Sequence, residues 1–150
     1  MNRLDPALAC TCFKLRSLAR RVTSIYDEVL AGAGITVTQY GVLTVLLGAK
    51  RAHESIGVTE LARRLRADRT TLTRGLNLLR DGGLITLGRR SDGGDARVKT
   101  VTITAQGERR RRAAQPLWSK AQARLQHHLG AAQHGALRKH LDRSAAAIGD

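Results

Sequence analysis

Four polar side chains between positions 69 and 80 have the types and the spacing that suit recognition of DNA bases: Thr70, Thr73, Arg74 and Asn77. At about 100° per residue they share one face of a helix, while the leucines at positions 72, 76 and 79 fall on the opposite face, where they would be buried. An arginine can donate two hydrogen bonds to guanine, an asparagine can pair with adenine, and a threonine offers a hydroxyl and a methyl group. The alternative is an ordinary polar face in contact with water. The short helix before this one, the hairpin after it and the net charge favour a helix that enters the major groove of double-stranded DNA.

Basic residues on either side of this helix suit contacts to the rest of a duplex. Arg69 is at the N-terminal end of the helix, in a position for a phosphate or the edge of a groove. Four more basic residues surround a turn-rich segment at positions 91–95: Arg89, Arg90, Arg97 and Lys99. Asp95 is two residues before Arg97, and we expect its carboxylate to pair with the guanidinium and orient it towards a narrow minor groove. The alternative is a solvated hairpin loop of mixed charge.

The composition also indicates a polyanionic partner. The chain has 26 Lys and Arg against 12 Asp and Glu, a net charge of +14. Such an excess destabilises a compact protein through self-repulsion, so a polyanion is the natural explanation, although an arginine-rich genome would raise the charge as well. With one Phe, one Trp and two Tyr, the chain has few rings for stacking on unpaired bases, which argues against single-stranded targets.

The elements expected around the candidate base-reading face form a winged helix-turn-helix. Thr59 is predicted to cap a short helix, and Asp68 a second helix that runs to about Arg80 and ends at Gly82-Gly83. Two short helices joined by a three-residue turn are a helix-turn-helix candidate. Apolar and polar residues then alternate over positions 84–87 and 98–104, around a tip rich in Gly and Asp, which predicts a β-hairpin wing.

Amphipathic helices are expected at both ends of the chain. Apolar residues recur at spacings of four and three from position 8 to 29, and Gly32 and Gly34 should end that helix. Thr38 is predicted to cap the next helix, and a loop should follow from position 48 to 57. From position 105 the chain is helical again, with a possible kink at Pro116 and a break at Gly130. We therefore predict a mainly α fold with a small β-hairpin wing (α+β), and apolar helix faces that also pack against a second subunit.

Several segments together resemble the MarR family of winged helix regulators. They are Val58-Thr59-Glu60-Leu61-Ala62, Asp68 to Arg74, Leu78 to Ile85, Asp95-x-Arg97, and Val101 to Thr104 followed by Gly107. The resemblance implies a single domain with a winged helix DNA-binding lobe at residues 36–104 and helical dimerisation regions at 1–35 and 105–150. It also implies a homodimer on a pseudo-palindromic operator, with wing arginines in minor grooves, and repression relieved by a phenolic compound, an oxidant or a metal.

Two cysteines near the N-terminus are candidates for a sensor. Cys12 lies on the apolar stripe of the first helix, about 21 Å along that helix from Tyr26, so the two could meet only across an antiparallel dimer seam. A disulfide between Cys10 and Cys12 within an intact helix has poor geometry. Cys12 with Tyr26 resembles the organic-hydroperoxide-sensing branch of the family, but Arg16 and Val37 stand where that branch has two further tyrosines. The alternatives for Cys12 are a small apolar residue in the seam or a metal ligand.

The sequence thus predicts a homodimeric, sequence-specific repressor released by a small molecule or an oxidant. By family likeness, an effector pocket is expected near Tyr26 and Tyr40. A non-specific DNA-binding protein would explain the charge equally well but not the polar face at positions 70–77. No nucleophile is accompanied by a base, and no histidine spacing selects a metal site, so we expect neither an enzyme nor a cofactor or metal. Without an apolar run of about 18 residues or a signal peptide, the protein should be cytoplasmic.

Overall fold

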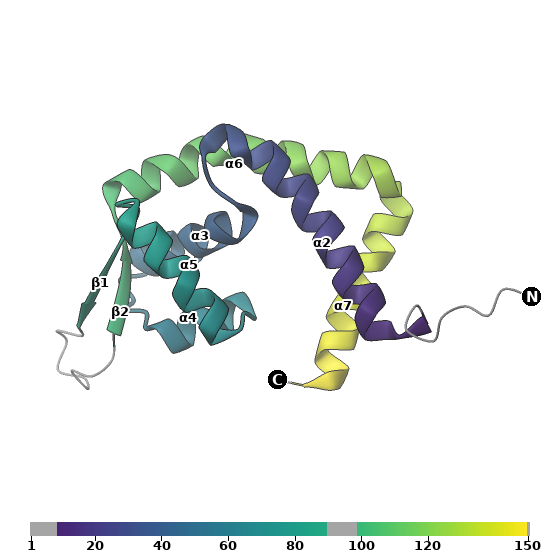
Figure 1. Cartoon of the computed structure of the whole chain (residues 1–150), viewed down its shortest axis with the longest axis horizontal. Coiled ribbons are helices and arrows are strands. Elements are labelled where there is room, and N and C mark those ends of the chain that lie inside the picture. Colours follow the sequence, from purple (N-terminus) through teal and green to yellow (C-terminus); the bar gives the residue numbers. More distant parts are fainter. Residues whose placement is uncertain (1–8, 90–98, 150) are drawn as a thin grey trace, which may run out of the picture.

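The computed structural model describes residues 9–89 and 99–149, with the backbone alone at Arg89. The elements are α2 (Thr11–Leu30), the 3₁₀ turn η1 (Ala31–Ala33), α3 (Val37–Arg51), α4 (Val58–Leu65), α5 (Arg69–Asp81), β1 (Ile85–Arg89), β2 (Lys99–Ile103), α6 (Ala105–Leu129) and α7 (Ala131–Ile148). They form an arch, in which α6 connects a lobe of α3, α4, α5 and the two strands to the pair α2 and α7 (Figure 1). The predicted fold class, mainly α with a two-stranded wing, is confirmed.

The predicted N-terminal helix ends at Leu30, before the expected glycines, and the 3₁₀ turn that follows it ends at a glycine in the left-handed region. Gly34 has φ 67°, and a Cβ there would lie 2.6 Å from Nη1 of Arg110. The predicted cap of the next helix is wrong: Thr36, not Thr38, accepts the hydrogen bond from the backbone N–H of Gln39. The Gln39 side chain in turn accepts from the backbone N–H of Thr36, which completes a capping box. The loop that was expected from position 48 starts only after Arg51.

The helix-turn-helix is confirmed, with one cap corrected. Gly57, not Thr59, is the N-cap of α4, so that helix starts without a side-chain cap. Arg66 ends it in the left-handed conformation, with φ 49°. Asp68 caps α5 as predicted, because its carboxylate accepts a hydrogen bond of 2.8 Å from the backbone N–H of Thr71. Gly83, at φ 71°, reverses the chain after α5.

The base of the wing is tied to both neighbouring helices. Strands β1 and β2 pair antiparallel, with Ile85 opposite Ile103. The backbone N–H of Val101 donates to the carbonyl of Ile56, which continues the pairing onto the segment before α4. The hydroxyl of Thr104 donates to the carbonyl of Gly83 at 2.7 Å and accepts from the N–H of Gly107 at 3.0 Å. The start of α6 is therefore fixed at the end of α5.

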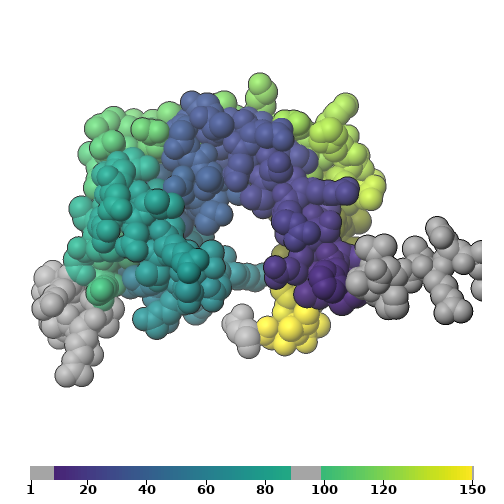
Figure 2. Space-filling model, viewed as in Figure 1, coloured from purple at the N-terminus to yellow at the C-terminus, as the bar shows by residue number. Residues whose placement is uncertain are grey.

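The core runs through the lobe and under α6. Its most buried side chains are aliphatic: Leu30, Leu43, Leu46, Leu61, Leu76, Leu79, Ile85 and Val42. Helix α6 continues through Pro116 and stops before Gly130, which has φ 79°, so the predicted break is confirmed. Large apolar side chains remain exposed on α2 and α7: Phe13, Leu15, Leu18, Leu141 and Ile148. An opening separates these two helices from the lobe (Figure 2).

Among the described residues, no single helix is long and apolar enough to cross a membrane. By length and composition only the consecutive segments Thr11–Ala33 and Val37–Arg51 would be, taken together, and they are bent by 70° from each other.

Candidate nucleic-acid interface

Helix α5 presents the polar face that the sequence predicts. Leu72, Leu76 and Leu79 are at most 3% exposed and fasten the helix to the core. The candidate base-reading residues are all exposed: Arg69, Thr70, Thr73, Arg74 and Asn77. The fold thus brings these side chains together on one accessible helix face, while their contact with DNA remains a prediction.

Most of the hydrogen-bonding capacity of this face is left for a ligand. The hydroxyl of Thr73 donates to the carbonyl of Arg69 at 2.8 Å, which leaves its lone pairs and its methyl group free. The side chains of Arg74 and Asn77 make no hydrogen bond or ion pair with residues 9–89 or 99–149. The hydrogen bond from Thr71 lowers the pKa of Asp68, so the cap stays charged and supports the positive end of α5. The side chains of Arg74 and Asn77 therefore keep their hydrogen-bond donors available to groups outside the chain.

An ion-pair network stabilises α4, the helix that precedes α5 in the helix-turn-helix. Glu60 accepts hydrogen bonds from Arg63 and Arg64, at 2.7 to 2.8 Å. Arg64 also pairs with Glu54, at 2.9 Å, in the loop before the helix. The two guanidinium groups lower the pKa of Glu60 to about 2. The network holds the loop and the first helix of the motif together.

The wing is described only at its base. The backbone of Arg89 pairs with Lys99, whose side chain is exposed. Arg90, Asp95 and Arg97 lie outside the described residues. The proposed pairing of Asp95 with Arg97 therefore stays a prediction.

The candidate sensor residues lie in the other half of the arch. Cys12 is exposed in the first turn of α2, and Cys10 is the N-cap, with an extended backbone. The objection to a disulfide assumed that one helix contains both cysteines, but α2 begins between them, at Thr11. Among the described residues, no three His, Cys, Asp or Glu side chains are grouped so as to hold a metal ion.

Tyr26 lies at a cavity of about 500 Å³ between α2, α6 and α7. The lining is mostly aliphatic, with the polar side chains of Gln122, His134 and Arg138 at it. The Tyr26 hydroxyl donates to Oε1 of Gln122. Burial raises the pKa of Tyr26, and the charge of Arg138 partly opposes this shift. A small amphipathic molecule would find both apolar surface and hydrogen-bonding groups here.

Tyr40 is not among the residues that line this cavity. It is 5% exposed, and its hydroxyl donates to Oε1 of Gln115 at 2.8 Å. Its ring stacks on Trp118, with 5.8 Å between centroids, and the Arg111 guanidinium lies 5.4 Å from its centroid. Sequence reasoning missed these partners on α6. Arg111, Gln115 and Trp118 are separated by four and three residues, which places them on one face of the helix. This spacing is the signal in the sequence that all three could contact the same side chain.

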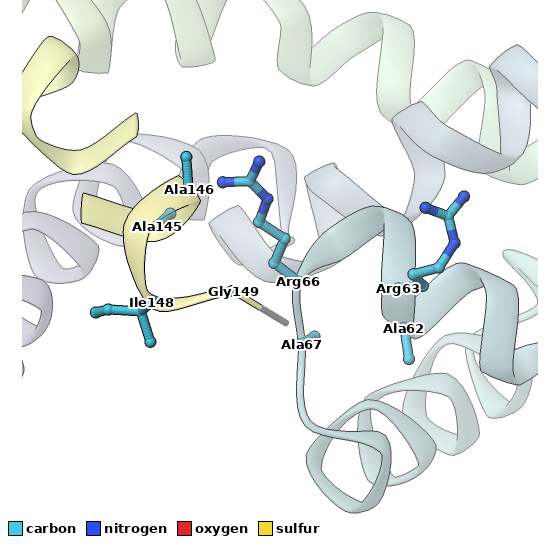
Figure 3. Close-up of a pocket in the computed structure, with 8 residues that line it drawn as sticks. All are labelled: Ala62, Arg63, Arg66, Ala67, Ala145, Ala146, Ile148 and Gly149. Atoms are coloured by element: carbon cyan, nitrogen blue, oxygen red, sulfur yellow. The ribbon is translucent and has the colours of Figure 1, made fainter. Parts of the chain in front are cut away.

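A second cavity, of about 800 Å³, lies where the lobe approaches the C-terminal end of α7. Arg63 and Arg66 line it from the lobe, and Ala145, Ala146 and Ile148 line it from α7 (Figure 3). The turn between the two helices of the helix-turn-helix thus faces α7.

Known proteins share this architecture. The family model described as MarR family matches residues 33–97. The transcriptional regulator MosR of M. tuberculosis, solved in complex with DNA, is 32% identical to the chain, and the match covers 93% of this chain and 96% of MosR with a TM-score of 0.76. No curated protein sequence gives a significant match.

Two more distant structures share the fold. PcaV of Streptomyces coelicolor, solved with its natural ligand, is 21% identical, with 99% of this chain and 100% of PcaV covered and a TM-score of 0.79. A mutant MarR of E. coli, solved with operator DNA, is 23% identical, with coverage of 87% and 89% and a TM-score of 0.71. With a 32% identical relative matched over nearly its whole length and the family model on its lobe, the chain belongs to the MarR family of transcriptional regulators.

Proposed function

We propose that two copies of the chain bind one pseudo-palindromic operator as a sequence-specific repressor, which a small molecule or an oxidant releases. The observation that carries this proposal is the α5 face, where Thr70, Thr73, Arg74 and Asn77 project from a helix that three buried leucines hold in place. The wing arginines would enter the adjacent minor groove, with Asp95 orienting Arg97. The DNA complex of the 32% identical relative supports this assignment.

The dimer is proposed from the apolar faces of α2 and α7. Phe13 is 59% exposed, Leu141 47% and Ile148 85%, although each belongs to an amphipathic helix. Exposed apolar side chains of this size on two neighbouring helices indicate an interface. Residues 1–35 and 105–150 would then form the dimerisation region and residues 36–104 the DNA-binding lobe.

The experiment is selection of duplexes from genomic fragments by the purified protein, followed by titration of the best fragment. Arg74→Ala should lose about 1–3 kcal/mol of binding free energy and relax the preference at one base position. Arg80→Ala is the matched control, because Arg80 lies on the same helix but is bonded to Asp81. If selected and scrambled duplexes bind equally well, the protein is a non-specific DNA-binding protein and the proposal is wrong.

For the signal, we propose two sites that separate experiments can test. Cys12 is exposed and lies beside the proposed seam, so its oxidation would alter the packing of α2. The cavity at Tyr26 would bind a small effector. Release of the operator by an organic hydroperoxide should occur with the wild type and fail with Cys12→Ser. Equal release of both proteins would exclude Cys12 as the sensor and leave the cavity.

We also propose that the protein acts in the cytoplasm, where its target DNA lies and where both thiols stay reduced. A regulator of this kind needs no catalytic group. Its activity would be the difference in operator affinity between two states of the dimer.

A further inference from the structure

One tyrosine of the DNA-binding lobe makes several contacts with α6. Tyr40 lies in the first turn of α3, and three residues of α6 contact it: Arg111 over the ring, Gln115 at the hydroxyl and Trp118 stacked on the ring. We call these four residues the Tyr40 clasp. Arg111 is also bonded through Nε to the hydroxyl of Thr44, one turn further along α3, at 3.3 Å. A hydrogen bond, a ring stack and a cation over the ring thus act on one side chain.

Two other attachments join the start of α6 to the lobe before the clasp. Thr104 is bonded to Gly83, and the backbone of Gly107 lies against the carbonyl of Leu84. Glu108 also pairs with Lys50 of α3. Positions 107 and 115 are about 12 Å apart along the helix axis. Attachments at the start alone would let a helix swing about its end, whereas a further attachment at that separation fixes its direction.

Beyond the clasp, α6 belongs to the other half of the arch (Figure 1). Gln122, two turns after Gln115, accepts from the Tyr26 hydroxyl of α2. Helix α6 therefore has two glutamines that bind the only two tyrosines of the chain, one from the lobe and one from the proposed dimer region. The angle between these regions depends on how firmly α6 is held at each end.

We propose that the Tyr40 clasp is the positioning device that fixes the angle of the DNA-binding lobe on α6, and thereby the half-site spacing that the dimer accepts. The proposal rests on the proposed function, because spacing has meaning only for a dimer on one duplex. Its four residues belong to α3 and α6, and none of them is on the α5 face. They act on operator choice through the direction of α6, as positioning residues rather than as contacts to bases.

The clasp predicts a distinct effect of substitution. A rigid dimer matches one spacing, since each inserted base pair turns a half-site by about a tenth of a turn. Loosening the clasp should let each lobe rotate, so that altered spacings bind better relative to the best one. Loss of a base contact would instead weaken all spacings by the same factor.

The experiment uses full-length protein and duplexes carrying the two half-sites that the wild type selects, with their spacing changed by −1, 0, +1 and +2 base pairs. Arg111→Met removes the cation, and Tyr40→Phe removes the hydroxyl but keeps the ring and its volume. Arg112→Met is the matched control, because it removes the same charge from an exposed neighbour on α6. The wild type and Arg112→Met should lose about tenfold in affinity for one inserted base pair, comparable to one mismatched base pair. Arg111→Met should lose severalfold less, and Tyr40→Phe should lie in between.

Trp118 gives a readout without DNA, since it is the only tryptophan of the chain. Its fluorescence should change in Arg111→Met and Tyr40→Phe and remain as in the wild type in Arg112→Met. The proposal is overturned if the spacing profiles of Arg111→Met and Tyr40→Phe equal that of the wild type while their tryptophan emission changes, or if all spacings weaken by one factor. A wild type that selects no sequence would contradict the proposed function instead. A circular dichroism melt that matches the wild type shows that each variant is folded.

Discussion

One glycine sets how closely α6 approaches the end of α5. A Cβ on Gly107 would lie 2.1 Å from the carbonyl oxygen of Leu84 and 2.9 Å from Cγ1 of Ile103. Both neighbours belong to the hydrogen-bonded base of the wing and have little freedom to move. The hydrogen atom of glycine is therefore a steric requirement of this junction, and its place in the family resemblance has a physical cause.

Gly107→Ala should destabilise the protein by about 1–3 kcal/mol, the usual effect of adding a methylene group to a packed site. Urea unfolding followed by circular dichroism measures the change. Gly135→Ala is the control, because Gly135 is in α7 with nothing within 4 Å of its Cβ position, and it should raise stability by up to about 1 kcal/mol. Equal stability of Gly107→Ala and the wild type would contradict so close an approach of α6 to Leu84.

Single residues also mark the limits of sequence reasoning. The α5 face and its Asp68 cap were predictable, because helical periodicity and local capping are encoded within one segment. The caps at Thr36 and Gly57 were not. Thr36 and Thr38 are both suitable N-caps for α3, and a contact distant in the sequence favours Thr36. The carboxylate of Asp27 accepts a hydrogen bond of 2.7 Å from the backbone N–H of Val37, which fixes the chain at the start of α3. Such a contact is invisible in a local pattern.

At the scale of elements, α4 depends on charge more than on a cap. The helix starts at Gly57 without a side-chain hydrogen bond, and Glu60 in its first turn binds Arg63 and Arg64. These guanidinium groups lower the pKa of Glu60 from 4.5 to about 2. Since the folded pKa lies below the unfolded one, the stabilisation is complete above about pH 4.5 and is lost as the pH falls towards 2.

Glu60→Gln should therefore reduce stability at neutral pH, and the difference from the wild type should shrink as the pH falls below about 4.5. Because the network is exposed, the effect at neutral pH will be small and will decrease with salt. Thermal melts of both proteins between pH 7 and pH 3 measure it. A difference that is the same at both ends of this range would show that the carboxylate charge of Glu60 does not act on stability.

The elements themselves were largely predictable from periodicity, as α5, the strand pair and the break at Gly130 show. The partners of α6 were not. Its buried residues are few and, apart from Leu125, small, so its pattern does not indicate which face packs or on what. Gln115 and Gln122 look like solvated residues in the sequence, and only the fold brings a tyrosine to each of them.

At the scale of the whole molecule, one charge on α7 tests the proposed dimer. Leu141→Glu should shift the protein towards monomer and weaken operator binding, because a charged group would replace an apolar side chain in the proposed seam and would lose its hydration there. Lys139→Glu, about 160° away around the same helix, changes the charge by more and should leave the dimer intact. Sedimentation at micromolar concentration distinguishes the two states. A dimer of unchanged stability in Leu141→Glu would place the subunit interface elsewhere.

The arch itself could not be read from the sequence. The two amphipathic ends and the winged helix lobe were each predictable as separate units, and the need for a partner subunit followed from their excess apolar surface. The opening between them depends on the length and direction of α6, which joins the units through contacts that are far apart in the sequence.

Because α6 is uninterrupted, a small tilt at one end of this helix displaces the other end by several ångströms. Its 25 residues extend for about 37 Å, from the end of α5 to the turn before α7. A tilt of about 5° at one end of a rod of this length displaces the other end by about 3 Å, close to the rise of one base pair. A small change in packing far from the duplex can therefore move α5 out of register with its groove, without any change in secondary structure.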